Sequence, residues 1–143
     1  MSEPQQLPLS TRLFALLRTM QLAIIVMSLF YVFLAELLRR NALMDVSSML
    51  PVVITLALVE GVVVVYLKQV KIPLTEETLR LDSEDTAGLA AARKWYVVAL
   101  ACCAGVSLYG FALRVMGATF WLAAIFYASG IALALYCTPR KPE

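Results

Sequence analysis

Apolar residues gather along the chain into four long runs, which short polar stretches separate. Each run has about 20 residues, the length that a helix needs to cross the hydrocarbon core of a bilayer. Inside such a core the backbone must bond to itself, and that requirement selects helices. The pattern therefore predicts an all-α integral membrane bundle of four transmembrane helices. The predicted spans are residues 20–38, 46–67, 95–113 and 117–137.

The polar connections predict how these spans pair. The segment RRNALMD joins the first two spans and RVM joins the last two. Connections this short predict two antiparallel helical hairpins. Residues 68–94 form the sizeable polar segment between the hairpins, so we expect a single membrane domain over residues 1–143.

The central segment has an internal pattern of its own. Pro73 is expected to end any continuation of the second helix, and Thr75 to begin a short new helix. The third helix is expected to begin near Glu84, with Asp82 or Ser83 as its cap. The acids of this segment form either a docking surface or a solvated loop; they are Glu76, Glu77, Asp82, Glu84 and Asp85.

The distribution of basic residues predicts the orientation. Nine of the twelve Lys and Arg residues fall in the amino terminus, residues 68–94 and the carboxyl tail. The positive-inside rule then places both termini and the 68–94 loop in the cytoplasm. The first span is too long for a signal peptide, and "AELLRRN" is a poor cleavage site, so we expect it to be retained. The expected interfacial aromatic residues are Trp95, Tyr96, Trp121 and Tyr136.

Composition supports the membrane assignment and narrows the function. Hydrophobic residues make up 62% of the chain and charged residues 15%, against about 45–50% and about 25% in soluble domains. A net charge of +2 without long basic runs argues against nucleic acid. Histidine is absent, which removes the commonest acid–base catalyst and zinc ligand. We find no catalytic constellation, metal cluster or phosphate loop, so the sequence predicts no enzyme, no cofactor and no metal.

Small residues predict where the helices pack, because lipid removes the apolar driving force between them. In the third span they recur on one face as Ala99, Cys103 and Ser107, and in the fourth as Ala124, Ala128 and Ala132. These faces are expected to meet within the hairpin or to pack on a partner chain. Gly105 and Gly130 add points of close approach, whereas Phe120, Phe126 and Ile131 are expected to face lipid. Cys102 and Cys103 are interpreted as small buried hydrophobes, and Cys137 is a candidate for palmitoylation.

Glu60 is the candidate intramembrane polar or ion site. It lies about 5 Å from the middle of the second span, at 1.5 Å per residue. A charge at that depth is costly, so we expect Glu60 to be protonated, paired or beside water. A largely neutral Glu60, bonded to another helix, is the prediction. The expected partners are Thr55, Ser28, Tyr31 and Ser107. Glu36, near the outer end of the first span, is expected to reach headgroups, Arg39 or Arg40.

Two functions follow from these features. The first is a non-catalytic subunit or accessory protein of a membrane complex, with the bilayer and other membrane subunits, or further copies of itself, as partners. The second is a small proton- or cation-coupled transporter or channel-forming oligomer that uses Glu60. The stretch LALVEG resembles the carboxylate helix of rotor-ring proteolipids, and a lone membrane glutamate resembles the small multidrug transporters. The resemblance covers about six residues, and the glycine ladder of the proteolipids is absent.

Overall fold

The computed structural model describes residues 9–38, 46–81 and 86–139. These residues form five α-helices and one π-helical turn, and they contain no strand. The predicted all-α fold is confirmed for this part of the chain. The predicted caps Asp82 and Ser83, and Glu84, lie outside the described residues. In chain order the elements are α1 (Leu9–Leu38), α2 (Leu50–Tyr66), η1 (Leu67–Lys71), α3 (Ile72–Leu81), α4 (Thr86–Val115) and α5 (Phe120–Tyr136).

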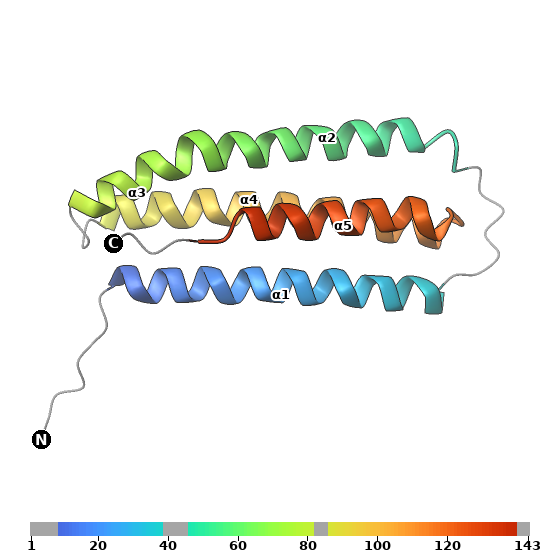
Figure 1. Cartoon of the computed structure of the whole chain (residues 1–143), viewed down its shortest axis with the longest axis horizontal. Helices are drawn as coiled ribbons and strands as arrows, with labels where there is room; N and C mark the ends of the chain where they lie inside the picture. Colours follow the sequence, from blue (N-terminus) through green and yellow to red (C-terminus); the bar gives the residue numbers. More distant parts are fainter. Residues whose placement is uncertain (1–8, 39–45, 82–85, 140–143) are drawn as a thin grey trace, which may run out of the picture.

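Helix α4 is the centre of the bundle. It packs against α1, α2, α3 and α5, and α1 also packs against α5. Successive spans run antiparallel, as predicted, so the start of α1, the end of α3, the start of α4 and the end of α5 lie at one end (Figure 1). We call this the loop end, and the opposite one, where α4 turns into α5, the turn end. The structure adds that α1 and α2 lie on opposite sides of the α4–α5 pair (Figure 1).

The helices have the length and apolarity of membrane spans. Three stretches are long and apolar enough to cross a bilayer: Thr11–Leu38, Leu50–Glu77 and Thr86–Val115. The apolar helix α5 has 17 residues, the lower limit of the range of about 17–25 residues for a spanning helix. Helix α1 begins at Leu9, well before the predicted span, and α4 begins at Thr86, close to the predicted start near Glu84. Most of residues 68–94 is helical, because η1, α3 and the start of α4 lie there.

The expectation that Pro73 ends the second helix is wrong. Helix α2 runs through the π-helical turn η1 into α3, and the rod bends there (Figure 1). In this wider turn the Ile72 N–H donates to the carbonyl of Leu67, five residues earlier. Proline is tolerated near the start of a helical segment, where its missing N–H matters least, and Pro73 is the second residue of α3. Thr75 therefore begins no new helix; its Oγ1 donates to the Lys71 carbonyl at 2.9 Å.

Small residues hold α5 against α4, but of the two predicted faces only that of α4 packs within the hairpin; packing of the α5 face on a partner chain stays a prediction. Ala99, Cys103 and Ser107 are fully buried on α4, as predicted. On α5, Ala128 and Ala132 are exposed. The buried side of α5 instead carries Ala123, Phe126, Tyr127, Gly130 and Ala134.

The close approach at Gly130 explains that rotation of α5. A Cβ on Gly130 would lie 2.2 Å from Ser107 Oγ and 2.9 Å from the Cys103 carbonyl oxygen. No other residue type fits there, so Gly130 must face α4 and Phe126, one turn earlier, faces inward with it. The expectation that Phe126 faces lipid is therefore wrong. Phe120 is exposed and Ile131 is half-buried.

The turn between α4 and α5 is a Schellman motif. The Gly117 N–H donates to the Arg114 carbonyl at 3.1 Å, and the Ala118 N–H donates to the Leu113 carbonyl at 2.9 Å. Gly117 has a φ of 105°, a conformation that favours glycine. Leu113 and Ala118 also pack in one buried cluster, the hydrophobic contact that accompanies this motif. This local geometry fixes the second hairpin.

Candidate functional site

Glu60 contacts another helix, but through a residue that the sequence analysis did not select. Its Oε1 accepts a hydrogen bond from Tyr109 Oη on α4 at 2.8 Å. None of the four expected partners forms that bond. Thr55 donates to the Pro51 carbonyl, Ser28 bonds to Ser107, and the Tyr31 carbonyl accepts from Tyr127. A tyrosine four residues after Gly105 on the facing helix was the available signal, because glycine opens space for a side chain and tyrosine supplies a donor.

The carboxyl group of Glu60 fills a notch that Gly105 leaves in α4. A Cβ on Gly105 would lie 2.8 Å from Glu60 Oε2 and 2.9 Å from Oε1. Oε2 is buried and has no hydrogen-bond partner among the described residues. We call Glu60, Tyr109 and Gly105 the carboxyl clamp. The clamp joins α2 to α4, and the neutral state expected for Glu60 stays a prediction.

A second polar contact closes the turn end. Arg114 is 5% exposed, and its Nε and Nη2 donate to the two carboxylate oxygens of Glu36 on α1. Its Nη1 donates to the Ala118 carbonyl in the α4–α5 turn at 2.8 Å. Bidentate pairs of this kind are among the stronger side-chain contacts. The expected partners of Glu36, Arg39 and Arg40, lie outside the described residues, and sequence reasoning missed Arg114.

A third polar group of contacts lies at the loop end. Gln21 on α1 is buried and donates to the Ala134 carbonyl at 2.7 Å and to Thr138 Oγ1 at 2.9 Å. Lys68 Nζ donates to the Thr138 carbonyl at 3.3 Å and lies 5.6 Å from the centre of the Tyr96 ring. Tyr96 Oη in turn donates to Glu76 Oε1 at 2.6 Å. These bonds tie α1, η1, α3 and α4 to the end of α5.

Two expectations about the loop end change accordingly. Tyr96 was expected at the membrane interface, but it is fully buried because it packs between α1 and α3 against Phe14 and Ile72. Glu76 was expected either on an acidic docking surface or in a solvated loop, but it lies on helix α3 and its carboxylate accepts the Tyr96 hydroxyl. Asp82, Glu84 and Asp85 lie outside the described residues. Trp121 and Tyr136 are exposed, which leaves them available as interfacial anchors.

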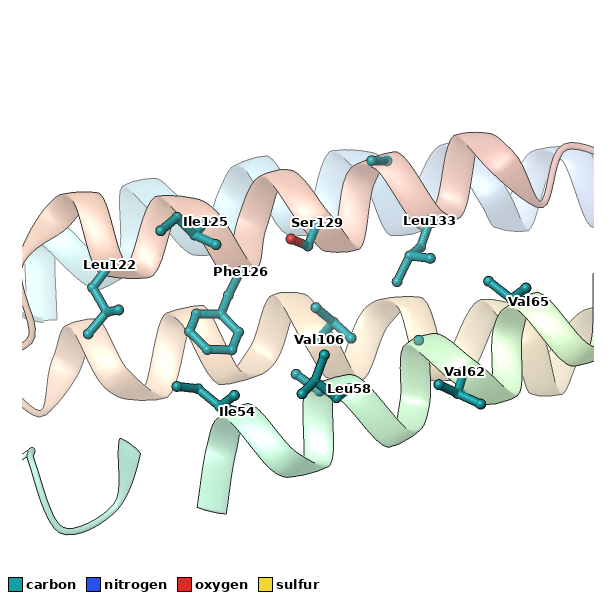
Figure 2. A pocket seen from close by; sticks show the side chains of 13 residues that line it. Ile54, Leu58, Val62, Val65, Val106, Leu122, Ile125, Phe126, Ser129 and Leu133 are labelled. Atoms are coloured by element: carbon teal, nitrogen blue, oxygen red, sulfur yellow. The ribbon is translucent and has the colours of Figure 1, made fainter. Parts of the chain in front are cut away.

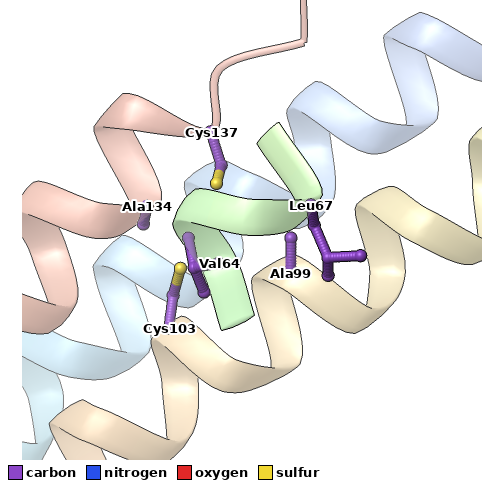
Figure 3. Close-up of a cluster of buried hydrophobic side chains, with 6 residues drawn as sticks. All are labelled: Val64, Leu67, Ala99, Cys103, Ala134 and Cys137. Carbon is purple, nitrogen blue, oxygen red and sulfur yellow. The ribbon is translucent and has the colours of Figure 1, made fainter. Parts of the chain in front are cut away.

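The cysteines behave as small buried hydrophobes. Cys103 and Cys137 are free thiols, both fully buried in a cluster with Val64, Leu67 and Ala134 (Figure 3). Cys102 is a half-buried free thiol. The burial of Cys137 argues against the predicted palmitoylation, because an acyltransferase cannot reach an enclosed sulfur. Within the described residues, no group of three His, Cys, Asp or Glu side chains is placed to hold a metal ion.

Two hollows lie along the seam between α2 and α5. The larger has a volume of about 860 Å³, and its side chains from α2, α4 and α5 converge in Figure 2. Ser129 supplies its one hydroxyl; every other lining side chain is apolar. The smaller, of about 540 Å³, lies at the loop end and is lined by Lys68, Ile72, Pro73, Glu76, Leu135, Tyr136 and Thr138.

Comparison of the chain with protein-family models, with curated proteins and with solved structures finds no match.

Proposed function

We propose that the chain is an integral membrane protein that serves as a non-catalytic subunit or accessory protein of a membrane complex. Its helices have the length and composition of membrane spans. We further propose that both termini and residues 68–94 face the cytoplasm, because nine of the twelve basic residues belong to these segments. The start of α1 and the end of α5 lie together at the loop end (Figure 1), which is compatible with that orientation.

The observation that carries the proposal is the set of contacts that the carboxyl group of Glu60 makes within the chain. Its carboxyl group is held between two helices of the same chain, bonded to Tyr109 and packed against Gly105. A carboxyl that carries protons or cations must exchange them with water, whereas a carboxyl in this position fastens α2 to α4. The structural role for a membrane acid therefore has the more direct support.

The outer face of α5 supports a role in assembly. Ala128 and Ala132 are exposed on the side of α5 that is turned away from α4. Small residues are the ones that allow membrane helices to pack closely. We propose the exposed face around Ala128 as a contact for a helix of another membrane subunit, beside the hollow that Ala132 lines.

Extraction of the tagged protein in mild detergent tests the proposal, with mass and subunit composition read on the intact particle. Stoichiometric amounts of other membrane proteins are expected. Ala128→Leu should reduce their recovery, because the larger side chain prevents close helix contact. Ala23→Leu, at an exposed position of α1, is the matched control. A lone chain or a pure homo-oligomer would contradict the accessory role.

The second candidate is transport through Glu60, and one observation favours it. Glu60 Oε2 is buried without a hydrogen-bond partner among the described residues, so this oxygen is available to a proton or cation. The candidate predicts that Glu60→Gln keeps the fold but abolishes proton-coupled flux in reconstituted vesicles. Unchanged flux would exclude it. Carbodiimide labelling also separates the two functions. Rapid labelling of Glu60 at neutral pH requires an accessible protonated acid and would favour transport, whereas protection would favour the structural contact.

A further inference from the structure

The larger hollow is an apolar groove that follows the membrane-spanning direction. Its α2 side runs from Ile54 to Val65 and its α5 side from Leu122 to Leu133, with Val106 of α4 as the floor. At 1.5 Å per residue the groove is about 17 Å long, so it covers most of the length of α5 and extends from the loop end past the middle of that helix. Its volume of about 860 Å³ is within the usual range of about 300–1,000 Å³ for small-molecule sites.

The smaller hollow continues the same seam at the loop end. Lys68 follows the last groove residue of α2, Val65, by one turn, and Leu135 follows Leu133 on α5. The two hollows are thus lined by the same two rods, α2 with its extension into α3 and α5 with its carboxyl end. The first is apolar, and the second carries one cationic and one anionic side chain.

The charged groups of the smaller hollow are positioned by contacts with the protein and keep hydrogen-bonding capacity for a ligand. Among the described residues Lys68 Nζ makes one hydrogen bond, to the Thr138 carbonyl, and an ammonium has three donors. Glu76 Oε1 accepts the Tyr96 hydroxyl, and an ionised carboxylate has further lone pairs to offer. Lys68 lies nearer the groove and Glu76 lies farther out along the rod. Positive and negative groups therefore follow the apolar groove in that order.

We propose that this seam binds one zwitterionic glycerophospholipid. Acyl chain lies in the apolar groove, the phosphate is bound by Lys68, and the headgroup ammonium is bound by Glu76. In such a lipid the acyl chain, the phosphate and the ammonium follow one another in the same order as the apolar groove, Lys68 and Glu76 along the seam. The paired charges favour a zwitterionic headgroup over an anionic one, because an anionic headgroup leaves Glu76 unmatched. The site would hold a lipid of the leaflet at the loop end, and it does not depend on the proposed protein partners.

Gly61 offers a way to fill the groove without disturbing the bundle. It lines the groove, and a Cβ there meets no atom within 4 Å. Gly61→Leu should therefore occupy the space of the acyl chain, while replacement of a helical glycine favours the helix. Ala23→Leu, on α1 at the far side of the bundle, is the matched control.

The test is native mass spectrometry of the detergent-purified chain after exchange into micelles doped with equal amounts of phosphatidylethanolamine, phosphatidylglycerol and diacylglycerol. One phosphatidylethanolamine per chain is expected in the unchanged protein and in Ala23→Leu. Its retention should fall at least tenfold in Gly61→Leu. Lys68→Gln should lower it about tenfold, because a hydrogen bond to a charged group is lost. Glu76→Gln, which can still accept the Tyr96 hydroxyl, should raise retention of phosphatidylglycerol relative to phosphatidylethanolamine.

Three results would overturn the proposal. Equal retention of diacylglycerol would remove the role of Lys68, and preferred retention of phosphatidylglycerol would remove that of Glu76. Unchanged lipid retention in Gly61→Leu would show that the lipid lies elsewhere. The subunit composition of the native particle is read separately, so failure of the lipid site and failure of the accessory role give different results.

Discussion

Helices α2 and α5 resemble each other in sequence and differ in how they pack. Each has 17 residues, is apolar and runs antiparallel to α4. Helix α5 buries Ala123, Phe126, Tyr127, Gly130 and Ala134, whereas α2 buries only Val64. The difference follows from side-chain size. Gly130 brings the backbone of α5 against α4, while the Val and Leu residues of α2 hold it away.

The comparison shows what fastens a helix in this bundle. In lipid, an apolar surface has little preference for another helix, so close contact depends on small residues and polar bonds. Helix α5 places the small residues Ala123, Gly130 and Ala134 on its buried side, together with the aromatic Phe126 and Tyr127. Helix α2 relies on the carboxyl clamp and on its covalent continuation into η1 and α3. The groove between α2 and α5 is a consequence of this looser attachment.

The sharpest test of the comparison is to add the same methyl group to a glycine of each helix. In Gly130→Ala the new Cβ meets Ser107 Oγ and the Cys103 carbonyl, and we expect a loss of about 3 kcal/mol in the free energy of unfolding. In Gly61→Ala the new Cβ meets nothing within 4 Å, and a gain of up to about 1 kcal/mol is expected. Unfolding by sodium dodecyl sulfate in mixed micelles measures both. Equal effects would refute the different packing of the two helices.

The second test concerns the turn end, where Arg114 ties α4 and the start of the α4–α5 turn to Glu36 of α1. Arg114→Met removes the bonds to Glu36 and to the Ala118 carbonyl. Because the buried Arg114 makes three hydrogen bonds that the substitution removes, a loss of about 2 kcal/mol is expected. Arg18→Met, at an exposed position, should change stability little. Adding Glu36→Gln to Arg114→Met should cost less than the sum of the two single changes, since both remove one contact.

The helices and their order were largely predictable from the sequence, but the rotation of each helix about its own axis was not. The apolar runs predict the helices and their antiparallel order because a bilayer leaves few alternatives. The small residues of α5 occur on two faces, and the regular spacing of Ala124, Ala128 and Ala132 drew attention to the face that does not meet α4. Only the fit of Gly130 against Ser107 decides between the faces, and that fit depends on a facing helix that periodicity does not place.

The sequence indicated that Glu60 must make a polar contact, but it did not indicate which residue is the partner. Glu60 stands out in the sequence as an acid at membrane depth, and that depth requires a polar contact. Glu60 meets Tyr109 because of the way α4 is rotated about its axis relative to α2. In the same way, Glu36 meets Arg114 because of the rotation of α1 relative to α4. The continuation of α2 through Pro73 depends on the π-helical turn, which no pattern in the sequence indicated.

The third test weakens the attachment of α2 alone. Tyr109→Phe removes the hydroxyl that donates to Glu60 Oε1, which leaves the carboxyl without a donor and should cost about 1 kcal/mol. Spin labels at the exposed positions Val59 and Ala101 should report a broader α2–α4 distance distribution. Tyr66→Phe, on the exposed face of α2, serves as the control. An unaltered distribution in Tyr109→Phe would mean that the clamp does not hold α2.

The smallest expected effect is that of Glu60→Gln. The amide oxygen of Gln can accept the Tyr109 hydroxyl as Glu60 Oε1 does, and the side chain has nearly the same shape. The amide nitrogen takes the place of Oε2, which already lacks a partner among the described residues. A loss within about 0.5 kcal/mol is therefore expected, measured by the same unfolding titration. Glu60→Leu removes the acceptor and should match the larger loss of Tyr109→Phe. If Gln instead destabilises as much as Leu, the ionised carboxylate itself holds the two helices together. A small loss in Gln, alongside a large one in Leu, identifies the shape and acceptor of the side chain as what fastens α2.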